Sequence, residues 1–126
     1  MANELRTFTL GDILAERQMQ FEATAGWTKD VVVRIGRPVR DPESSRAWVC
    51  PYQIEGLGHD FVKGIFGADA MQALVLSLHS IPGELAAFTR DPGGKFARHG
   101  KPDSSLLYAC RTTLELAGDA FPESAD

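Results

Sequence analysis

Residues 47–55 read Ala-Trp-Val-Cys-Pro-Tyr-Gln-Ile-Glu, a run in which large apolar side chains recur at every second position. Successive side chains of a strand point to opposite faces, so this alternation predicts a half-buried β-strand. The residues on its buried side are Trp48, Cys50, Tyr52 and Ile54. Pro51 has no amide hydrogen to donate, which indicates an edge strand, a bulge or an amide directed away from any partner strand.

Two more strands are predicted on the N-terminal side of this run. Ile13–Ala23 alternates in the same way, except that Arg17 falls on the apolar side, where it either snorkels past the sheet edge or pairs with a buried acid. The β-branched run Val31–Ile35 follows after a short turn and predicts a hairpin with the first strand. This second strand is expected to end near Pro38.

A helix is predicted on the C-terminal side. Gly56–Gly58 ends the third strand, and Phe61–Phe66 forms either a short fourth strand, which we favour, or an irregular bridge. Asp69 is a plausible N-cap, and apolar residues then recur at spacings of three and four, which is typical of a helix. These residues are Met71, Leu74, Val75, Leu78, Ile81, Leu85 and Phe88. Pro82 inside the pattern predicts a kink, or two helices that meet there.

The remainder of the chain has weaker patterns. Arg90–Ser104 is rich in glycine and proline and is predicted to be a loop. Residues 105–117 suit either a helix or a strand, with Thr112–Leu116 favouring a strand. The two ends, about residues 1–11 and 119–126, are expected to be flexible.

These elements predict one α+β domain over residues 1–126, with an antiparallel meander sheet of three to five strands and a long kinked helix on one face. A chain of 126 residues with 44% hydrophobic content has room for one core. The expected core is Ile13, Met19, Phe21, Val31, Val33, Ile35, Trp48, Cys50, Tyr52, Ile54, Leu74, Leu78 and Leu85.

Charge and composition exclude several classes of protein. A formal net charge of -4, from 13 basic and 17 acidic residues, disfavours nucleic-acid binding. The longest apolar run, Ala73–Leu78, is too short to span a membrane, and the N-terminus lacks a signal-peptide hydrophobic region, so we expect a cytoplasmic protein. Cys50 and Cys110 have no CxxC spacing and are expected to be core residues in a reducing compartment.

Known catalytic motifs are absent from the sequence. No phosphate-binding, dinucleotide-binding, metalloprotease or serine-hydrolase pattern occurs, so we predict no catalytic residue and no cofactor. The three histidines have no further ligands at metal-binding spacing, so no metal site is predicted. The candidate ligand or partner patch comprises polar residues flanking the third strand and the helix start, together with one aromatic residue in the first hairpin loop. They are Gln53, Glu55, His59, Asp69, Gln72 and Trp27.

Three segments carry a resemblance to a known family. They are Val33–Pro38 (VRIGRP), Trp48–Gly58 (WVCPYQIEGLG) and Gly67–Leu74 (GADAMQAL). They resemble a family of short bacterial proteins of unknown function, over about residues 13–90. The resemblance implies a bacterial source and a shared fold in which Thr112–Pro122 is a strand that ends in a turn. It implies no activity, catalytic residue or ligand.

Small size, acidic charge and missing motifs favour a non-enzymatic protein-interaction module, such as an adaptor or an immunity-like protein. The alternative is a small-molecule-binding or enzymatic domain that uses the polar patch near Gln53, Glu55, His59 and Asp69. A homo-oligomer paired through sheet edges is a third hypothesis, against which Pro51 partly argues. The expected partner is another protein, with no nucleic acid and no membrane.

Overall fold

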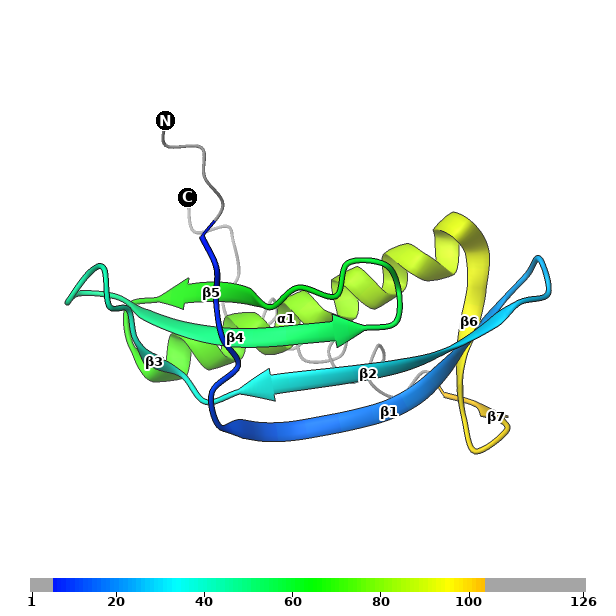
Figure 1. Cartoon of the computed structure of the whole chain (residues 1–126), viewed down its shortest axis with the longest axis horizontal. Coiled ribbons are helices and arrows are strands. Elements are labelled where there is room, and N and C mark those ends of the chain that lie inside the picture. The colour runs from blue at the N-terminus through cyan, green and yellow to red at the C-terminus, as the bar shows by residue number, and fades with distance from the viewer. Residues whose placement is uncertain (1–5, 104–126) are drawn as a thin grey trace, which may run out of the picture.

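The computed structural model describes residues 6–103, which form an antiparallel sheet with one helix packed on one face (Figure 1). The strands are β1 (Ile13–Ala23), β2 (Thr28–Gly36), β3 (Val39–Arg40), β4 (Trp48–Glu55), β5 (Lys63–Gly67), β6 (Gly94–Arg98) and β7 (Lys101–Pro102). The helix is α1 (Ala70–Phe88), and a π-helical turn, Thr89–Gly93, follows it. The α+β class and the antiparallel sheet are confirmed, but the described residues alone contribute seven strands to the sheet, where three to five were expected.

Strands β1, β2, β4 and β5 follow one another as a meander. β2 pairs with the second half of β4, and β3 pairs with Trp48 and Val49, the first two residues of β4. β5 pairs with those same two residues, so β3 and β5 must lie on opposite edges of β4. The chain therefore bends at Arg37 and Pro38 and continues along the same edge of β4. The second strand ends near Pro38 as expected, while the short strand β3 that follows was not predicted.

The Arg90–Ser104 stretch, predicted to be a loop, contains two strands in its described part. β6 pairs with the end of β1, from Gln20 to Ala23, and turns back into β7 at His99 and Gly100. Both turn residues have positive φ, 54° and 78°, the geometry that suits a two-residue hairpin loop. The glycines and prolines mark the ends of these short strands, which is why the composition suggested a loop.

The helix packs on β4 and β5 through residues spaced four apart, namely Ala73, Ser77, Ile81 and Leu85. The predicted helix face is correct at Ile81 and Leu85, which are buried, but wrong at Leu78, an expected core residue that is 43% exposed. Small side chains allow the closer approach that decides the face: a Cβ at Gly67 would lie 2.4 Å from the amide nitrogen of Ala73. The helix continues through Pro82 as one element, as the prediction of a single long helix required, and the alternative of two helices that meet at Pro82 is wrong.

Most of the expected core is buried. The confirmed residues are Met19, Phe21, Val31, Val33, Ile35, Cys50, Tyr52, Ile54 and Leu85, while Trp48 and Leu74 are partly buried against them. Ile13 is 49% exposed because it lies at the first residue of β1, where the pairing with β2 is irregular. Phe96 of β6 joins the core and contacts Phe21 with ring centroids 5.0 Å apart.

The face of the sheet that packs on α1 is the inner face, and the opposite one is the outer face. Residues before β1 cross the outer face over β4 and β5 (Figure 1). Phe8 covers Gly64 and meets Phe66 edge-on, and Arg6 pairs with the buried carboxylate of Asp41 across 2.8 Å. The described part of the N-terminal end, predicted to be flexible, thus has specific contacts. Residues 105–117, with Cys110, and residues 119–126 lie outside the described range.

Candidate functional site

Arg34 is the centre of a polar cluster on the outer face. Its Nη1 atom lies 3.0 Å from Gln53 Oε1 and 2.6 Å from Glu55 Oε1, and its Nε lies 2.8 Å from Glu16 Oε2. The hydrogen bonds to Glu55 and then Glu16 hold the pKa of Arg34 above its ordinary value. Gln53 and Glu55 were expected to share one face, and they do, but both are engaged by an arginine that lies opposite them on β2.

The loop between β4 and β5 is held by Asp60. Its backbone carbonyl accepts a hydrogen bond from Gln53 at 2.7 Å, and its carboxylate accepts one from the amide of Gly56 at 3.0 Å. His59 meets the ring of Phe61 edge-on, with centroids 6.4 Å apart, and Phe61 is 62% exposed. The Asp60 carboxylate is therefore committed to the loop backbone and is not paired with the neighbouring His59.

Asp69 and Gln72 cap the start of α1. The Asp69 carboxylate accepts a hydrogen bond from the Gln72 amide at 2.8 Å, and the Gln72 side chain accepts one from the Ala68 amide at 2.6 Å. This pattern satisfies one amide in the first turn of the helix and one amide just before the N-cap. Within residues 6–103, no hydrogen bond or ion pair joins these two side chains to Gln53, Glu55 or His59.

Trp27 folds back over the end of the sheet. Its ring lies 5.6 Å from that of Phe21, and it remains 42% exposed. It borders a small cavity of about 90 Å³ together with Leu57 and Phe88. Its contacts place it at the opposite end of the sheet from the helix cap, so the six candidate residues form separate groups.

Two buried groups that could have been reactive are tied into the packing. Cys50 has no exposure, and burial raises the pKa of its thiol, which donates to the carbonyl of Gly36. The hydroxyl of Tyr52 donates to Glu84, which also pairs with Lys63. Burial and the hydrogen bond to Glu84 raise the pKa of Tyr52 above its ordinary value. Both groups therefore keep their protons, and the Tyr52 contact anchors α1 to the sheet.

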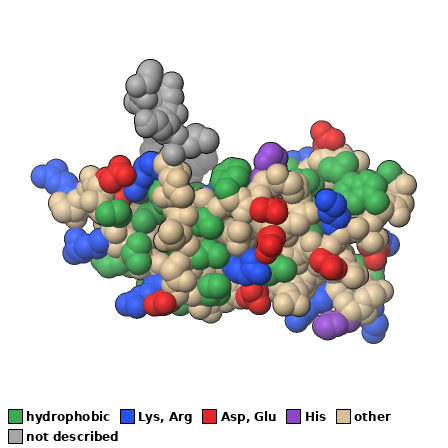
Figure 2. Space-filling view, viewed as in Figure 1, with side chains coloured by type: hydrophobic (Ala, Val, Ile, Leu, Met, Phe, Trp, Pro, Cys, Tyr) green, Lys and Arg blue, Asp and Glu red, His purple; other side chains and the backbone are tan. Residues whose placement is uncertain are grey.

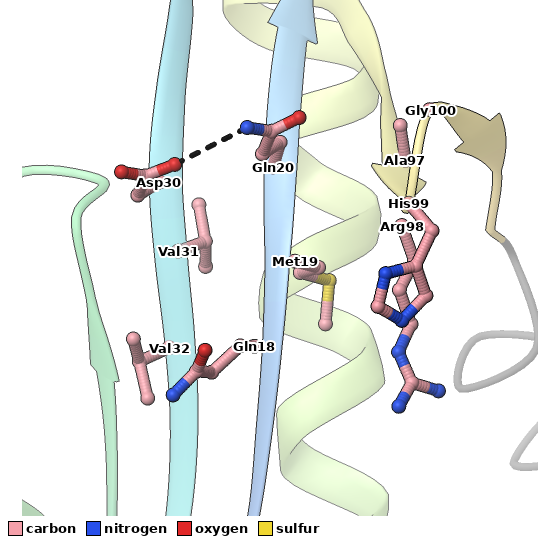
Figure 3. A pocket seen from close by; sticks show the side chains of 10 residues that line it. All are labelled: Gln18, Met19, Gln20, Asp30, Val31, Val32, Ala97, Arg98, His99 and Gly100. Atoms are coloured by element: carbon pink, nitrogen blue, oxygen red, sulfur yellow. Dashed lines mark hydrogen bonds between the residues drawn. The ribbon is translucent and has the colours of Figure 1, made fainter.

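An open groove lies beside β1, at the point where the β6–β7 hairpin diverges from it (Figure 3). The groove has a volume of about 580 Å³, and its lining includes Gln18, Gln20, Asp30, Val32, Arg98 and His99. Gln20 of β1 reaches toward Asp30 of the neighbouring strand β2. Arg98 and His99 project from the β6–β7 hairpin on the other side of β1. This site was missed from the sequence because its second wall lies in the stretch predicted to be a loop.

The groove opens on a face where charges of both signs are mixed. Figure 2 shows acidic and basic side chains interspersed over this face, with apolar side chains gathered in patches between them, including one at the upper right. Ion pairs account for part of this mixture, including Arg34 with Glu16 and Lys95 with Glu22. The groove itself has one carboxylate, Asp30, and one guanidinium, Arg98, on its two sides.

Neither a metal-binding cluster of side chains nor a membrane-spanning helix occurs within residues 6–103. No group of three or more His, Cys, Asp or Glu side chains in this range is placed to hold a metal ion. In the same range, no helix has both the length and the apolar character needed to cross a membrane.

Comparison with known proteins gives one match. A family model described as a domain of unknown function (DUF6968) matches residues 15–107. No curated protein and no solved structure matches the chain.

Proposed function

The chain belongs to the DUF6968 family of domains of unknown function, whose model covers residues 15–107, and on this footing we propose that it is a non-enzymatic protein-interaction module. The groove beside β1 is the surface that receives the partner, an extended segment of another protein. This proposal deepens the hypothesis of an adaptor or immunity-like protein by giving it a place on the molecule.

The observation that carries the proposal is the pair of carboxamides of Gln18 and Gln20. Both are exposed in the groove, Gln20 has only a long hydrogen bond of 3.4 Å to Asp30, and Gln18 has no side-chain hydrogen bond within residues 6–103. A carboxamide donates and accepts hydrogen bonds as a peptide group does. Residues two apart in a strand are separated by about 6.8 Å, which matches the repeat of an extended peptide laid alongside.

The shape of the groove also supports a polypeptide segment over a small metabolite. Small-molecule pockets enclose most of their ligand and are mainly apolar. This groove of about 580 Å³ is instead open to solvent, and its lining mixes polar side chains such as Gln18 and Gln20 with apolar ones such as Val32, so it would leave much of a small ligand exposed. The alternative of a small-molecule-binding or enzymatic patch has less support, because Arg34 engages Gln53 and Glu55 while Asp69 caps the helix.

We also infer that the module works in the reducing cytoplasm of a bacterium. The support is the fully buried thiol of Cys50, which packs as a small core residue, and the resemblance noted in the sequence.

The test is selection of binders from a phage-displayed library of random peptides, followed by affinity measurement with fluorescent copies of the enriched peptides. The double variant Gln18→Ala, Gln20→Ala is expected to weaken binding by about tenfold or more. The matched control is Glu22→Ala, Lys95→Ala, which removes an outer-face ion pair beside the groove and should change affinity less than about twofold.

Nuclear magnetic resonance locates the bound peptide independently. Amide shifts on addition of an enriched peptide should concentrate in β1 and residues 97–100. No enriched peptide, or shifts concentrated on α1, would contradict the proposal.

A further inference from the structure

We propose that the β6–β7 hairpin selects an acidic side chain in the peptide segment that occupies the groove beside β1, and that Arg98 and Lys101 bind this side chain. Asp30, on the other wall of the groove, then selects a basic side chain in the same segment. This inference rests on the proposed function and deepens it, because it gives the partner segment a charge pattern.

The β6–β7 hairpin, residues 94–102, is basic in an acidic protein. It contains Lys95, Arg98 and Lys101, all exposed, and no acidic residue, whereas the chain as a whole has a formal net charge of -4. Lys95 is paired with Glu22 across 3.8 Å. Within the described part of the chain, neither Arg98 nor Lys101 has an acidic partner. The hairpin therefore presents two cations that are available to a ligand.

Arg98 and Lys101 lie directly opposite each other in the hairpin. The two-residue loop between them, His99 and Gly100, has positive φ at both positions, which suits a tight turn that fixes this register. Directly opposite side chains in an antiparallel pair lie on the same face with Cβ atoms about 5 Å apart, and like charges placed there destabilise the pair. An anion bound between the two cations removes this repulsion, so the hairpin is suited to bind one.

The hairpin also forms one wall of the groove. Arg98 and His99 line this wall, and Asp30 of β2 lies on the other (Figure 3). Gln20 connects the walls, because it is paired with Asp30 on one side and with Ala97, the neighbour of Arg98, on the other. The strands that carry the walls are thus two strand spacings apart, roughly 10 Å. The groove has opposite charges on its two sides.

An extended peptide can match both walls. Its successive side chains point to opposite sides, so a residue directed at Arg98 is followed by one directed at Asp30. A carboxylate makes strong, charge-assisted hydrogen bonds with guanidinium and ammonium groups, and a lysine or arginine of the peptide makes them with Asp30. The partner segment is therefore expected to carry an acidic and a basic residue at an odd spacing.

The same charges disfavour a nucleic acid as the ligand of the hairpin. A polyphosphate has a negative charge at every repeat, so it would meet Asp30 on the opposite wall. Beyond Asp30 it would meet the Arg34 cluster, in which the carboxylates of Glu16 and Glu55 share one guanidinium. A peptide avoids this repulsion, because its charge can change sign from one residue to the next.

Charge reversal in the full-length protein tests the proposal with peptides enriched from the phage-displayed library. The double variant Arg98→Glu, Lys101→Glu should weaken binding of an enriched peptide by about tenfold or more, because two attractive charges become repulsive. Replacing the acidic residue of that peptide by lysine should restore affinity for the variant to within about threefold of the original pair. This rescue also shows that the variant is folded.

The matched control is Arg37→Glu, Arg46→Glu, which makes the same change in net charge. Both arginines are exposed; Arg37 follows β2 and Arg46 precedes β4, at the end of the sheet away from the groove. Charges separated by more than about 10 Å are largely screened at physiological salt, so this control should change affinity by less than about twofold.

Three results would overturn the inference. If peptide binding depends on Gln18 and Gln20 but changes as little in the hairpin variant as in the control, the proposed function stands and the two cations only protect the edge strand β7 from pairing. If no peptide is enriched, both the inference and the proposed function fail. If a single-stranded oligonucleotide binds more tightly than any peptide, and the hairpin variant loses that binding, the hairpin recognises nucleic acid instead.

Discussion

Ser77 in α1 donates its hydroxyl to the backbone carbonyl of Cys50 in β4 across 3.0 Å, and neither residue is exposed to solvent. A small polar side chain at this position brings the helix close to the sheet while its own hydrogen-bonding group is satisfied. The contact explains why the helix packs through this face and leaves larger apolar side chains outside.

Ser77→Leu is expected to destabilise the protein. The larger side chain has no space between α1 and β4, and overpacking of this kind lowers the free energy of unfolding by about 1–3 kcal/mol. Urea denaturation followed by circular dichroism measures the change. Ser80→Leu is the control, because the Ser80 hydroxyl bonds only within the helix, to the Leu76 carbonyl. Equal losses for the two variants would contradict the close packing at Ser77.

Gly67→Ala and Gly83→Ala are expected to act in opposite directions. A Cβ at Gly67 would lie 2.4 Å from the backbone nitrogen of Ala73, so the substitution must push α1 away from β5 and lower stability by about 1–3 kcal/mol. A Cβ at Gly83 meets no atom within 4 Å, so alanine there should add about 0.5–1 kcal/mol through helix propensity. The melting temperatures of both variants measure these effects. A higher melting temperature for Gly67→Ala would contradict the close approach of α1 to Gly67.

Tyr52→Phe is expected to lose stability in a pH-dependent way. Removing the hydroxyl that donates to Glu84 should cost about 1.5 kcal/mol near neutral pH. The folded state raises the pKa of Tyr52, so above about pH 10 ionisation of the unfolded chain weakens the wild type while the phenylalanine variant lacks this effect. The stability gap should therefore narrow between pH 9 and pH 11. A constant gap in urea denaturation over that range would contradict the assignment.

Asp41→Asn is expected to weaken the protein at neutral pH and to have less effect in acid. The hydrogen bond from Arg6, followed by that from the Glu43 amide, holds the pKa of Asp41 below its ordinary value. Its contribution is present above about pH 4 and is lost as the pH falls further, because the carboxylate is then protonated. Asp12→Asn is the control: Asp12 is 83% exposed and lies 3.7 Å from Arg37. Urea denaturation at neutral pH and below about pH 4 measures both variants. The Asp12→Asn substitution should change the denaturation midpoint little under either condition.

Much of the sheet could be predicted because its strands have local signals. Residues 13–23, 31–35 and 47–55 alternate with period two, and the turns between them contain glycine or proline. The β6–β7 hairpin could not be predicted, since its strands are too short to show a period and are surrounded by the turn residues that bound them. Phe96 is the residue that could have indicated a buried strand there, because it is the one large apolar side chain in Arg90–Ser104.

The helix was predicted, but its buried face was predicted only in part: Ile81 and Leu85 are buried as expected, while Ala73 and Ser77 were missed. Apolar residues lie on two neighbouring flanks of α1, so periodicity alone favoured the flank with the larger side chains. Which flank is buried depends on how closely the start of α1 approaches Gly67 of β5. That contact joins two elements and leaves no local pattern in the sequence.

The candidate site was recovered only in part. Gln53 and Glu55 share a face because strand geometry requires it, but their partner Arg34 belongs to a strand whose register could not be derived from sequence. The helix cap at Asp69 was correctly indicated as an N-cap. The groove depends on how β6 diverges from β1, and no local pattern records that divergence.

Pairing of β6 with β1 covers only Gln20–Ala23, so within residues 6–103 the first half of β1 has no strand on that edge. Such an edge is a template on which other chains can add strands and form aggregates. Arg17 lies in the middle of it and points to the inner side, where it pairs with Asp103. A strand from another molecule would have to cover this ion pair, so the single charge that interrupts the apolar pattern of β1 makes strand addition at this edge less favourable.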